Sequence, residues 1–160
     1  TVALLIIGLA AMRFERWTIT TRSRFENLLA LSPQVVWFGQ PDGCITYCNP
    51  YWYEYTGLSE KRTLGHEWTK AIHPDDRDSV VGGLQEALRE GKDYEVEFRL
   101  RGKDGEYCWF LAKGRSGRDN SGKVDAWLGI AVDIEQRKKA EEEARAASQA
   151  KSEFLASMSH

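Results

Sequence analysis

The residue best suited to chemistry in this sequence is His160, which ends the 160 residues. It follows a run from residue 135 that is rich in Lys, Arg, Glu and Ala and has no Gly or Pro, a pattern that predicts a solvated helix. A histidine with a core role is not expected at the end of such a helix. A neutral imidazole near pH 7 has a free nitrogen lone pair that can attack a phosphoryl group. We therefore predict that His160 is an accessible nucleophile; the alternative is a histidine without a role.

The remaining histidines and the cysteines predict no other reactive site. His66 and His73 are interpreted as structural. The three cysteines, Cys44, Cys48 and Cys108, are odd in number and lack CxxC spacing, so we predict reduced thiols with no disulfide framework and no metal site. The sequence also has no catalytic carboxylate pair, nucleophile elbow or phosphate-binding loop.

The composition predicts one domain of ordinary size with extensions. The chain is 42% hydrophobic, which is enough to build a core. It is 29% charged with a net charge of −2, so no nucleic-acid partner is expected.

The first residues have the pattern of a membrane segment. Val2–Met12 is an uncharged apolar run, shorter than the roughly 20 residues that span a bilayer. Arg13, Arg16 and Trp17 follow, as at the cytoplasmic end of a membrane helix. We predict that residues 1–24 are the end of a transmembrane helix and its connector, with the domain on the cytoplasmic side of the inner membrane. A signal-peptide core or a helix packed on the domain are the alternatives.

Alternating apolar and polar residues, separated by turn formers, predict an α+β fold. The predicted strands are Val35–Gly39, Cys44–Cys48, Tyr94–Arg101, Tyr107–Arg115 and Ala126–Ile134. The predicted helices cover residues 1 to about 31, Pro50–Tyr55, Glu67–Ile72, a longer segment to about Arg89, and residues 135–160. The natural packing is a five-stranded antiparallel sheet with helices on one face, flanked by N- and C-terminal helices.

The longer helix before Arg89 has recognisable start and stop signals. Asp75 or Asp76 is predicted to cap its first turn, and Gly91 is predicted to end it. Gly82-Gly83 lies inside it and is interpreted as a tolerated kink, with close approach of a strand or ligand as the alternative.

Residues 25–135 resemble a PAS domain of the sensor-kinase type, and residues 25–134 are identified as that domain. The resemblance rests on the order of Asp42-Gly43-x-Ile45-x-Tyr47-x-Asn49, Trp68-x-x-x-x-His73-Pro74-Asp75-Asp76-Arg77, Tyr94-x-x-Glu97-Phe98-Arg99-x-x-x-Lys103-Asp104-Gly105 and Gly129-Ile130-x-x-Asp133-Ile134. It implies that Asn49 caps a helix and that Asp133 ties the last strand to the exit helix. Glu135 replaces the Thr that usually follows Asp-Ile, so Asp133 and Glu135 are the predicted signal-relay residues.

Residues 135–160 resemble the signalling helix and the start of the dimerisation helix of a histidine kinase, and Phe154–His160 resembles its phosphoacceptor box. The resemblance implies that His160 is phosphorylated, that the protein is a homodimer, and that a response regulator is its partner. ATP and Mg²⁺ would bind in a kinase domain outside these residues, so no kinase activity is expected from them alone. Two heptad registers predict a weak parallel coiled coil. One uses residues 140, 144, 147, 151, 154 and 158, and the other uses 134, 137, 141, 144, 148, 151, 155 and 158.

Aromatic residues between sheet and helices predict a candidate ligand pocket. Its predicted lining is Phe38, Tyr47, Trp52, Trp68, Phe110 and Trp127. Plain core packing is the alternative for these aromatics, and strand parity leaves Trp109 as an alternative to Phe110. The sequence leaves the identity of a ligand open, and the candidates are a small molecule or FAD. Covalent flavin chemistry is not expected, because Gly65-His66-Glu67-Trp68 lacks the cysteine of light-sensing relatives and Ala131 replaces their Gln. Haem is not expected, because residues 75–90 contain no His.

Three functions follow from these patterns. The first is the sensory PAS module of a membrane-bound sensor histidine kinase, which relays a signal through the helical connector to His160. The second is a PAS dimerisation and relay module without its own ligand. The third is the PAS sensor of another effector, such as a cyclic-dinucleotide synthase, because linkers like residues 135–141 occur there too; Phe154–His160 favours the kinase.

Overall fold

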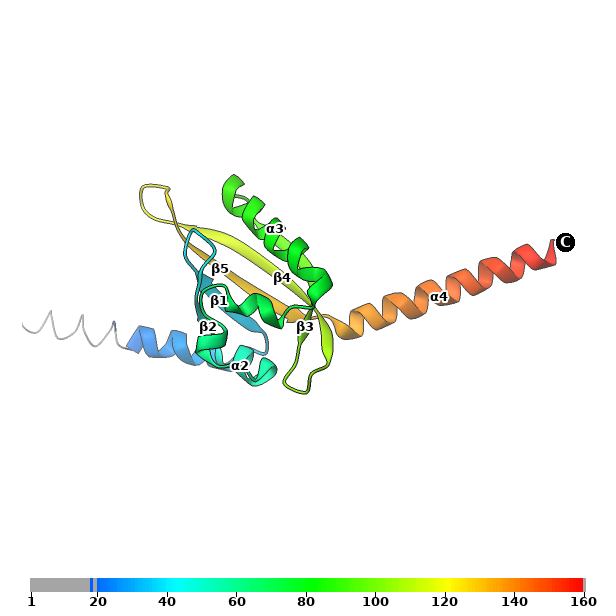
Figure 1. Ribbon diagram of the computed structural model, residues 1–160, viewed down its shortest axis with the longest axis horizontal. Helices are drawn as coiled ribbons and strands as arrows, with labels where there is room; N and C mark the ends of the chain where they lie inside the picture. Colours follow the sequence, from blue (N-terminus) through cyan, green and yellow to red (C-terminus); the bar gives the residue numbers. More distant parts are fainter. Residues whose placement is uncertain (1–17, 19, 160) are drawn as a thin grey trace, which may run out of the picture.

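The computed structural model describes residue 18 and residues 20–159 of the chain. The apolar run Val2–Met12 and His160 lie outside the described residues. A helix over residues 20–31 leads into the domain, and Figure 1 shows it at the opposite end from the C-terminal helix. Among the described residues, no helix combines the length and hydrophobicity needed to cross a bilayer.

The elements after this first helix form a five-stranded antiparallel sheet with connecting helices. In chain order they are β1 (Val35–Gly39), β2 (Ile45–Cys48), α2 (Pro50–Thr56), the 3₁₀ helices η1 (Glu60–Arg62) and η2 (Glu67–Ala71), α3 (Pro74–Glu90), β3 (Tyr94–Arg101), β4 (Tyr107–Arg118), β5 (Val124–Asp133) and α4 (Glu135–Met158). The strand order is β2-β1-β5-β4-β3, with every neighbouring pair antiparallel. The predicted fold class is confirmed.

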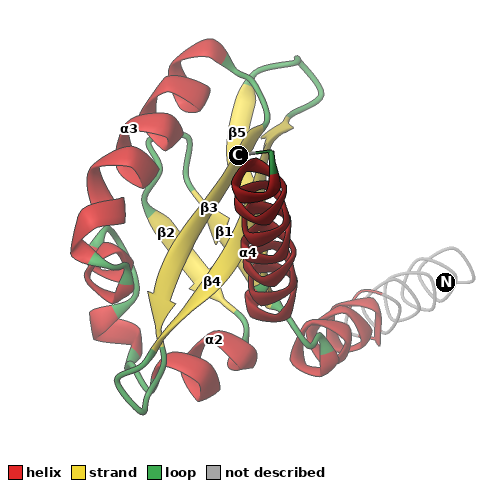
Figure 2. Ribbon diagram, turned by 90° about the vertical axis from the view of Figure 1, so that its right-hand side faces the viewer, coloured by secondary structure: helices red, strands yellow, loops and turns green. Residues whose placement is uncertain are grey.

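The core lies between the sheet and the helices that connect β2 to β3. Ile72, Leu100 and Phe110 are fully buried there. Figure 2 shows the sheet beside the long helix α3, with α4 seen nearly end-on. Because α4 has no buried residue and starts at the end of β5, it extends away from the core instead of covering it.

The start and the middle of α3 differ from the prediction. His73 occupies the N-cap position, and its Nδ1 accepts a hydrogen bond from the backbone N–H of Asp75 at 3.2 Å. The predicted cap at Asp75 or Asp76 is therefore wrong, because Pro74 already occupies the first helical position. The predicted end at Gly91 is confirmed by its left-handed backbone, with a φ of 64°.

Gly83 lies where α3 approaches β3 closely. A Cβ at this position would lie 3.0 Å from Cε2 of Tyr94, whose hydroxyl donates a hydrogen bond to the Val80 carbonyl at 2.7 Å. The helix continues without interruption through this point. The interpretation of Gly82-Gly83 as a kink is therefore wrong at Gly83, where close approach of a strand is the reason for glycine.

Candidate functional site

A small cavity lies inside the core between the sheet and α3. Its volume is about 60 Å³, and two of the predicted pocket residues, Trp52 and Trp68, line it. The lining side chains that the sequence did not single out include Val35, Trp37, Cys48, Tyr94, Phe98 and Ala112.

The other four predicted pocket residues lie elsewhere. Phe38 and Tyr47 stack on each other on the opposite face of the sheet, with ring centroids 5.3 Å apart. Phe25, from the first described helix, stacks on Phe38 with a centroid separation of 6.3 Å. Phe110 is buried edge-on against Tyr55 at 5.0 Å, and Trp127 is buried in a neighbouring cluster under α3. The structure therefore brings only Trp52 and Trp68 together at the cavity.

The lining of the cavity is almost entirely apolar. Trp52 donates a hydrogen bond from Nε1 to Oγ1 of Thr63 at 2.9 Å, whereas the buried Nε1 of Trp68 has no partner in the described part of the chain. Burial raises the pKa of the Cys48 thiol to about 12, so this thiol stays neutral and unreactive at physiological pH. Within the described residues, no group of three His, Cys, Asp or Glu side chains could hold a metal ion.

The cavity volume limits the size of a ligand. For comparison, an engineered cavity of about 150 Å³ binds benzene. The volume here is about 60 Å³, so neither a flavin nor a haem fits the core as it is folded.

The predicted relay residues meet at the junction between β5 and α4. Oδ1 of Asp133 accepts a hydrogen bond from the backbone N–H of Glu135 at 2.8 Å. Oε2 of Glu135 accepts one from the backbone N–H of Trp109 at 2.9 Å, and the Trp109 carbonyl accepts one from the Ile134 N–H at 2.8 Å. The start of α4 is therefore tied to a single residue near the start of β4, Trp109.

Charged groups hold the first turn of α4 against the sheet. Glu97 of β3 forms ion pairs with both Arg137 and Lys138, and the hydrogen bonds from Lys138 and then Arg137 lower the pKa of its carboxyl. The Lys138 ammonium lies 4.7 Å from the centroid of the Trp109 ring, and the Arg99 guanidinium carbon lies 5.3 Å from it. We call Glu97, Arg99, Trp109 and Lys138 the α4 anchor. No sequence pattern identifies this group, because its members come from three elements.

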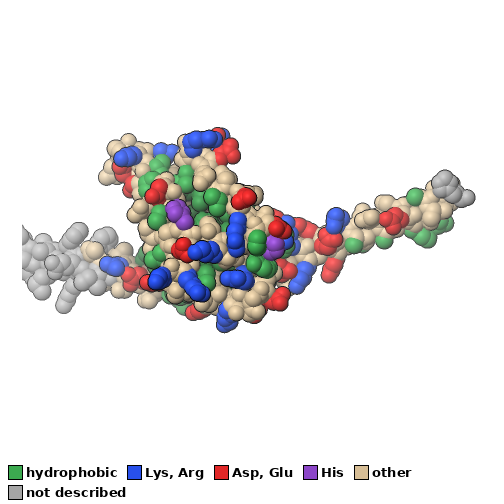
Figure 3. All heavy atoms as spheres, viewed as in Figure 1, with side chains coloured by type: hydrophobic (Ala, Val, Ile, Leu, Met, Phe, Trp, Pro, Cys, Tyr) green, Lys and Arg blue, Asp and Glu red, His purple; other side chains and the backbone are tan. Residues whose placement is uncertain are grey.

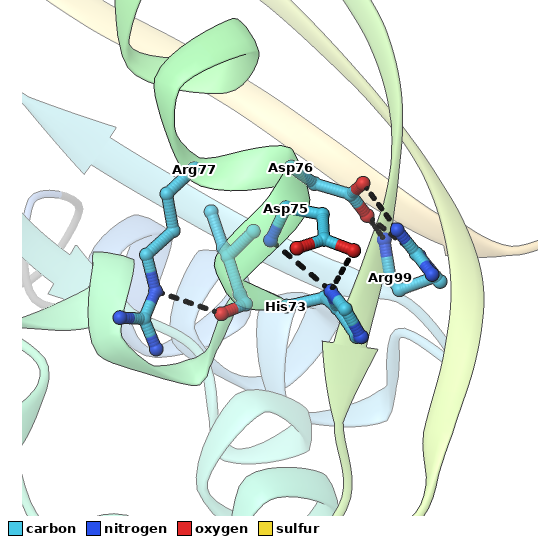
Figure 4. Close-up of polar contacts among 6 residues, drawn as sticks. His73, Asp75, Asp76, Arg77 and Arg99 are labelled. Carbon is cyan, nitrogen blue, oxygen red and sulfur yellow. Dashed lines mark hydrogen bonds and ion pairs between the residues drawn. The ribbon is translucent and has the colours of Figure 1, made fainter.

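The start of α3 is joined to the same strand of the sheet (Figure 4). Oδ2 of Asp76 accepts hydrogen bonds from the backbone N–H and from Nε of Arg99, both at 2.9 Å, and Oδ1 accepts one from Nη2 at 2.7 Å. These bonds lower the pKa of the Asp76 carboxyl. Arg99 therefore contacts the start of α3 through its guanidinium and lies beside the ring of Trp109, which links α3 to the α4 anchor.

The rest of α4 is exposed. Phe154, Leu155 and Met158 are 63%, 56% and 67% exposed, although apolar side chains of this size favour burial. Figure 3 shows hydrophobic side chains on the surface towards the far end of this helix. The helix therefore presents an apolar patch without a partner inside the described chain.

The fold and its helical connector define a sensory domain, and comparison with known proteins identifies the family. Residues 45–131 match the family model described as the PAS fold, which is more than half of the chain. The chain belongs to the PAS family.

Relatives of the chain include histidine kinases. It is 37% identical over 113 residues to the uncharacterized protein y4lL of Sinorhizobium fredii, covering 71% of this chain and 14% of that protein. It is 31% identical over 154 residues to the peroxide stress-activated histidine kinase mak1 of Schizosaccharomyces pombe, covering 85% of this chain and 9% of that protein. The chain therefore spans only a small part of these relatives.

Solved structures agree with the family. A sensory box histidine kinase/response regulator from Burkholderia thailandensis superimposes with a TM-score of 0.59 at 27% identity, covering 79% of this chain and 96% of that one. The chain is thus a PAS sensory domain homologous to the sensor regions of histidine kinases.

Proposed function

We propose that the chain is the sensory PAS module of a two-component sensor histidine kinase and that α4 relays its signal to autophosphorylation of His160. The observation that carries the proposal is the attachment of α4. Its first turn is held by Glu135 and the α4 anchor, whereas the rest of the helix is unburied. Because α4 is attached to the sheet at its first turn, a small movement of the sheet there would displace the far end of the helix.

In this mechanism a ring nitrogen of His160 attacks the γ-phosphorus of ATP, the bond to the β-phosphate oxygen breaks, and ADP leaves. ATP and Mg²⁺ bind in a kinase domain outside these 160 residues. The phosphoryl group then passes to a carboxylate of a response regulator.

The proposal includes a membrane anchor and a second subunit. Residues 1–24 form the end of an inner-membrane helix and its connector, residues 25–134 form the PAS domain on the cytoplasmic side, and residues 135–160 begin the dimerisation helix. The apolar run Val2–Met12 supports the anchor. The exposed Phe154, Leu155 and Met158 support a parallel coiled coil between two copies.

The relay is tested by disulfide crosslinking at two adjacent positions. Ala147 belongs to one predicted heptad register and Ser148 to the other, so Ala147→Cys and Ser148→Cys report which register faces the partner. We expect the ratio of the two crosslinking yields to change when the kinase is switched between its active and inactive states. The half-buried background thiols at Cys44 and Cys108 are replaced by serine, whereas the buried Cys48 is left in place.

The outcome that contradicts the relay is an unchanged crosslinking ratio while autophosphorylation responds to the signal. His160→Gln serves as a separate check on the phosphoacceptor, because it should abolish phosphorylation of the full-length kinase and leave crosslinking intact.

A second candidate function is a PAS relay module without a ligand of its own. The small cavity of about 60 Å³ favours this alternative over binding of a large cofactor. Native mass spectrometry with an absorption spectrum of the purified protein separates the two. Added mass or a visible band supports a bound ligand, and a dimer with neither supports a pure relay.

A further inference from the structure

A surface hollow lined by cations lies between the two 3₁₀ helices and the end of β3. Its volume is about 210 Å³. The lining combines side chains of η1, η2, β3 and the loop before η1, namely Leu58, Arg62, Glu67, Lys70, Ala71 and Arg101. Figure 3 shows several Lys and Arg side chains close together on the face of the molecule between α2 and α3. The hollow is separate from the core cavity, because the two share no lining residue.

Contacts between the backbones of these elements bring the cations together from distant parts of the sequence. The backbone N–H of Trp68 donates to the carbonyl of Thr63 at 3.2 Å, which joins η2 to the end of η1. The end of η2 is joined to β3 by a bridge between Ile72 and Leu100, and both of these residues are fully buried. The backbone that carries the cations is therefore held in place before any ligand binds, which lowers the entropy cost of binding.

Both arginines of the hollow have no carboxylate partner. Glu67 is the one acidic side chain among the residues that line the hollow, and it already pairs with Lys70 at 2.6 Å. Arg62 and Arg101 form no ion pair and no side-chain hydrogen bond in the described part of the chain. The hollow therefore offers two guanidinium groups, each of which is a fork of donors that fits the oxygens of a carboxylate or a phosphate.

The charge of the hollow distinguishes between these two kinds of anion. Each arginine carries one positive charge, whereas the charges of Lys70 and Glu67 cancel each other. A carboxylate has a single negative charge, but a phosphate monoester has close to two at neutral pH. Its three terminal oxygens can also accept hydrogen bonds from two guanidinium groups at once. The hollow therefore fits a phosphate monoester better than a carboxylate.

We propose that this hollow binds the phosphate monoester group of a ligand through Arg62 and Arg101. The same group occurs in small soluble phosphomonoesters and in the headgroup of phosphatidic acid, so the recognition chemistry is shared by both. The hollow has no residue in common with the α4 anchor. The inference therefore goes beyond the proposed relay and does not depend on it.

The first test compares methyl phosphate with methyl sulfate, which have similar shapes and differ by about one negative charge at neutral pH. The full chain, labelled with ¹⁵N at arginine, is titrated with each anion at constant ionic strength and followed by the Nε–H signals. We expect methyl phosphate to bind about tenfold more tightly and to move the signals of Arg62 and Arg101. Equal affinities, no binding of methyl phosphate, or binding that leaves both signals in place would overturn the proposal.

A double variant tests the two arginines directly. Arg62→Gln with Arg101→Gln removes both charges from exposed side chains, and it should weaken methyl phosphate binding at least about tenfold. Lys113→Gln with Arg115→Gln is the matched control, because it removes the same charge from β4 at side chains that pair with carboxylates. The control should keep the affinity of the unmodified chain. An equal loss in both double variants would mean nonspecific attraction and would overturn the site.

Vesicles separate the two sources of the phosphate group. Phosphatidylcholine vesicles with and without added phosphatidic acid are compared by flotation with the full chain. Added phosphatidic acid that increases binding of the unmodified chain, and not of the double variant at Arg62 and Arg101, assigns the site to the lipid headgroup. Binding of methyl phosphate without such an increase assigns the site to a soluble phosphomonoester.

Discussion

At the residue scale, Asn49 joins three segments of the domain. It is fully buried, and its Oδ1 accepts a hydrogen bond from the Val36 N–H at 2.9 Å. Its Nδ2 donates to the carbonyls of Leu29 and Gln34, both at 3.0 Å. Although Asn49 occupies the N-cap position of α2, its side chain makes no capping bond. The N-cap position that the resemblance implies is confirmed, but the capping bond comes from the Asn49 backbone carbonyl, which accepts from the Trp52 N–H at 3.1 Å, because the side-chain oxygen is already bonded to β1.

Replacing Asn49 by Ala should therefore be costly. Asn49→Ala leaves one N–H and two carbonyl groups without their partner, so we expect the free energy of unfolding to fall by roughly 3 kcal/mol. Asn120→Ala, in the exposed turn between β4 and β5, is the matched control and should change it by less than about 0.5 kcal/mol. Urea unfolding measures both, and equal losses for the two variants would contradict the role of Asn49.

Asp76 is predicted to make stability depend on pH. Its folded pKa lies below the unfolded value of about 3.9, so its contribution is complete above that value and is lost as the pH falls through the folded pKa. We expect Asp76→Asn to cost about 2 kcal/mol at pH 7 and to flatten the loss of stability below about pH 4. The exposed Asp78 on the same helix provides the control Asp78→Asn, which should keep the steep pH dependence of the unmodified chain.

At the element scale, the α4 anchor determines how firmly the connector is attached. Glu97 is its central carboxylate because it pairs with two cations of the first turn of α4. The Trp109 ring contacts the cations of both Arg99 and Lys138. The anchor therefore holds the first turn of α4 through ion pairs and cation–π contacts. Such contacts between exposed charges are weaker than a packed apolar interface.

Removing the charge of Glu97 should loosen the start of α4. We expect Glu97→Gln to speed amide hydrogen exchange at residues 136–142 about fivefold, because one carboxylate loses two ion pairs. Glu95→Gln is the matched control on the same strand, since the ion pair of Glu95 is with Lys113 of β4 at 3.0 Å, and only its longer-range charge acts on Arg137 of α4. Mass-spectrometric exchange checks both variants, and a similar acceleration in the control would mean that the effect is not specific to the anchor.

At the scale of the whole molecule, the two terminal helices extend from opposite ends of the sheet (Figure 1). Phe25 of the first helix stacks on Phe38 of β1, and α4 is tied to Trp109 of β4. β1 and β4 both pair with β5, the central strand. The sheet therefore connects the first helix to α4.

The apolar end of α4 is predicted to hold two copies together. Replacing Phe154, Leu155 and Met158 by Ser should weaken dimerisation of the full chain at least about tenfold, because their apolar surface is then no longer buried between two helices. Ala150→Ser, which lies in neither predicted register, is the control and should leave the dimer unchanged. Sedimentation equilibrium measures both, and an undiminished dimer in the triple variant would place the interface elsewhere.

The sequence by itself determined the elements of this protein and their order. Strict alternation predicts Tyr94–Arg101 as a strand, and the structure has the same bounds. Turn residues and Gly91 mark element ends correctly, because backbone conformations that favour glycine are local properties. Other predicted strand ends were wrong by a few residues: β4 continues to Arg118, β5 runs over Val124–Asp133 and not Ala126–Ile134, and β2 begins at Ile45 and not at Cys44.

Only the tertiary structure decided which side chains share a site. The apolar run of β1 does not alternate, so pairing with β5 and β2 decided that Trp37 faces the cavity and that Phe38 stacks with Tyr47 on the other face. The anchor joins Glu97 and Lys138, which are far apart in the sequence. The cavity volume depends on how closely α3 approaches the sheet at Gly83. These properties arise from contacts between distant residues, and local periodicity has no information about such contacts.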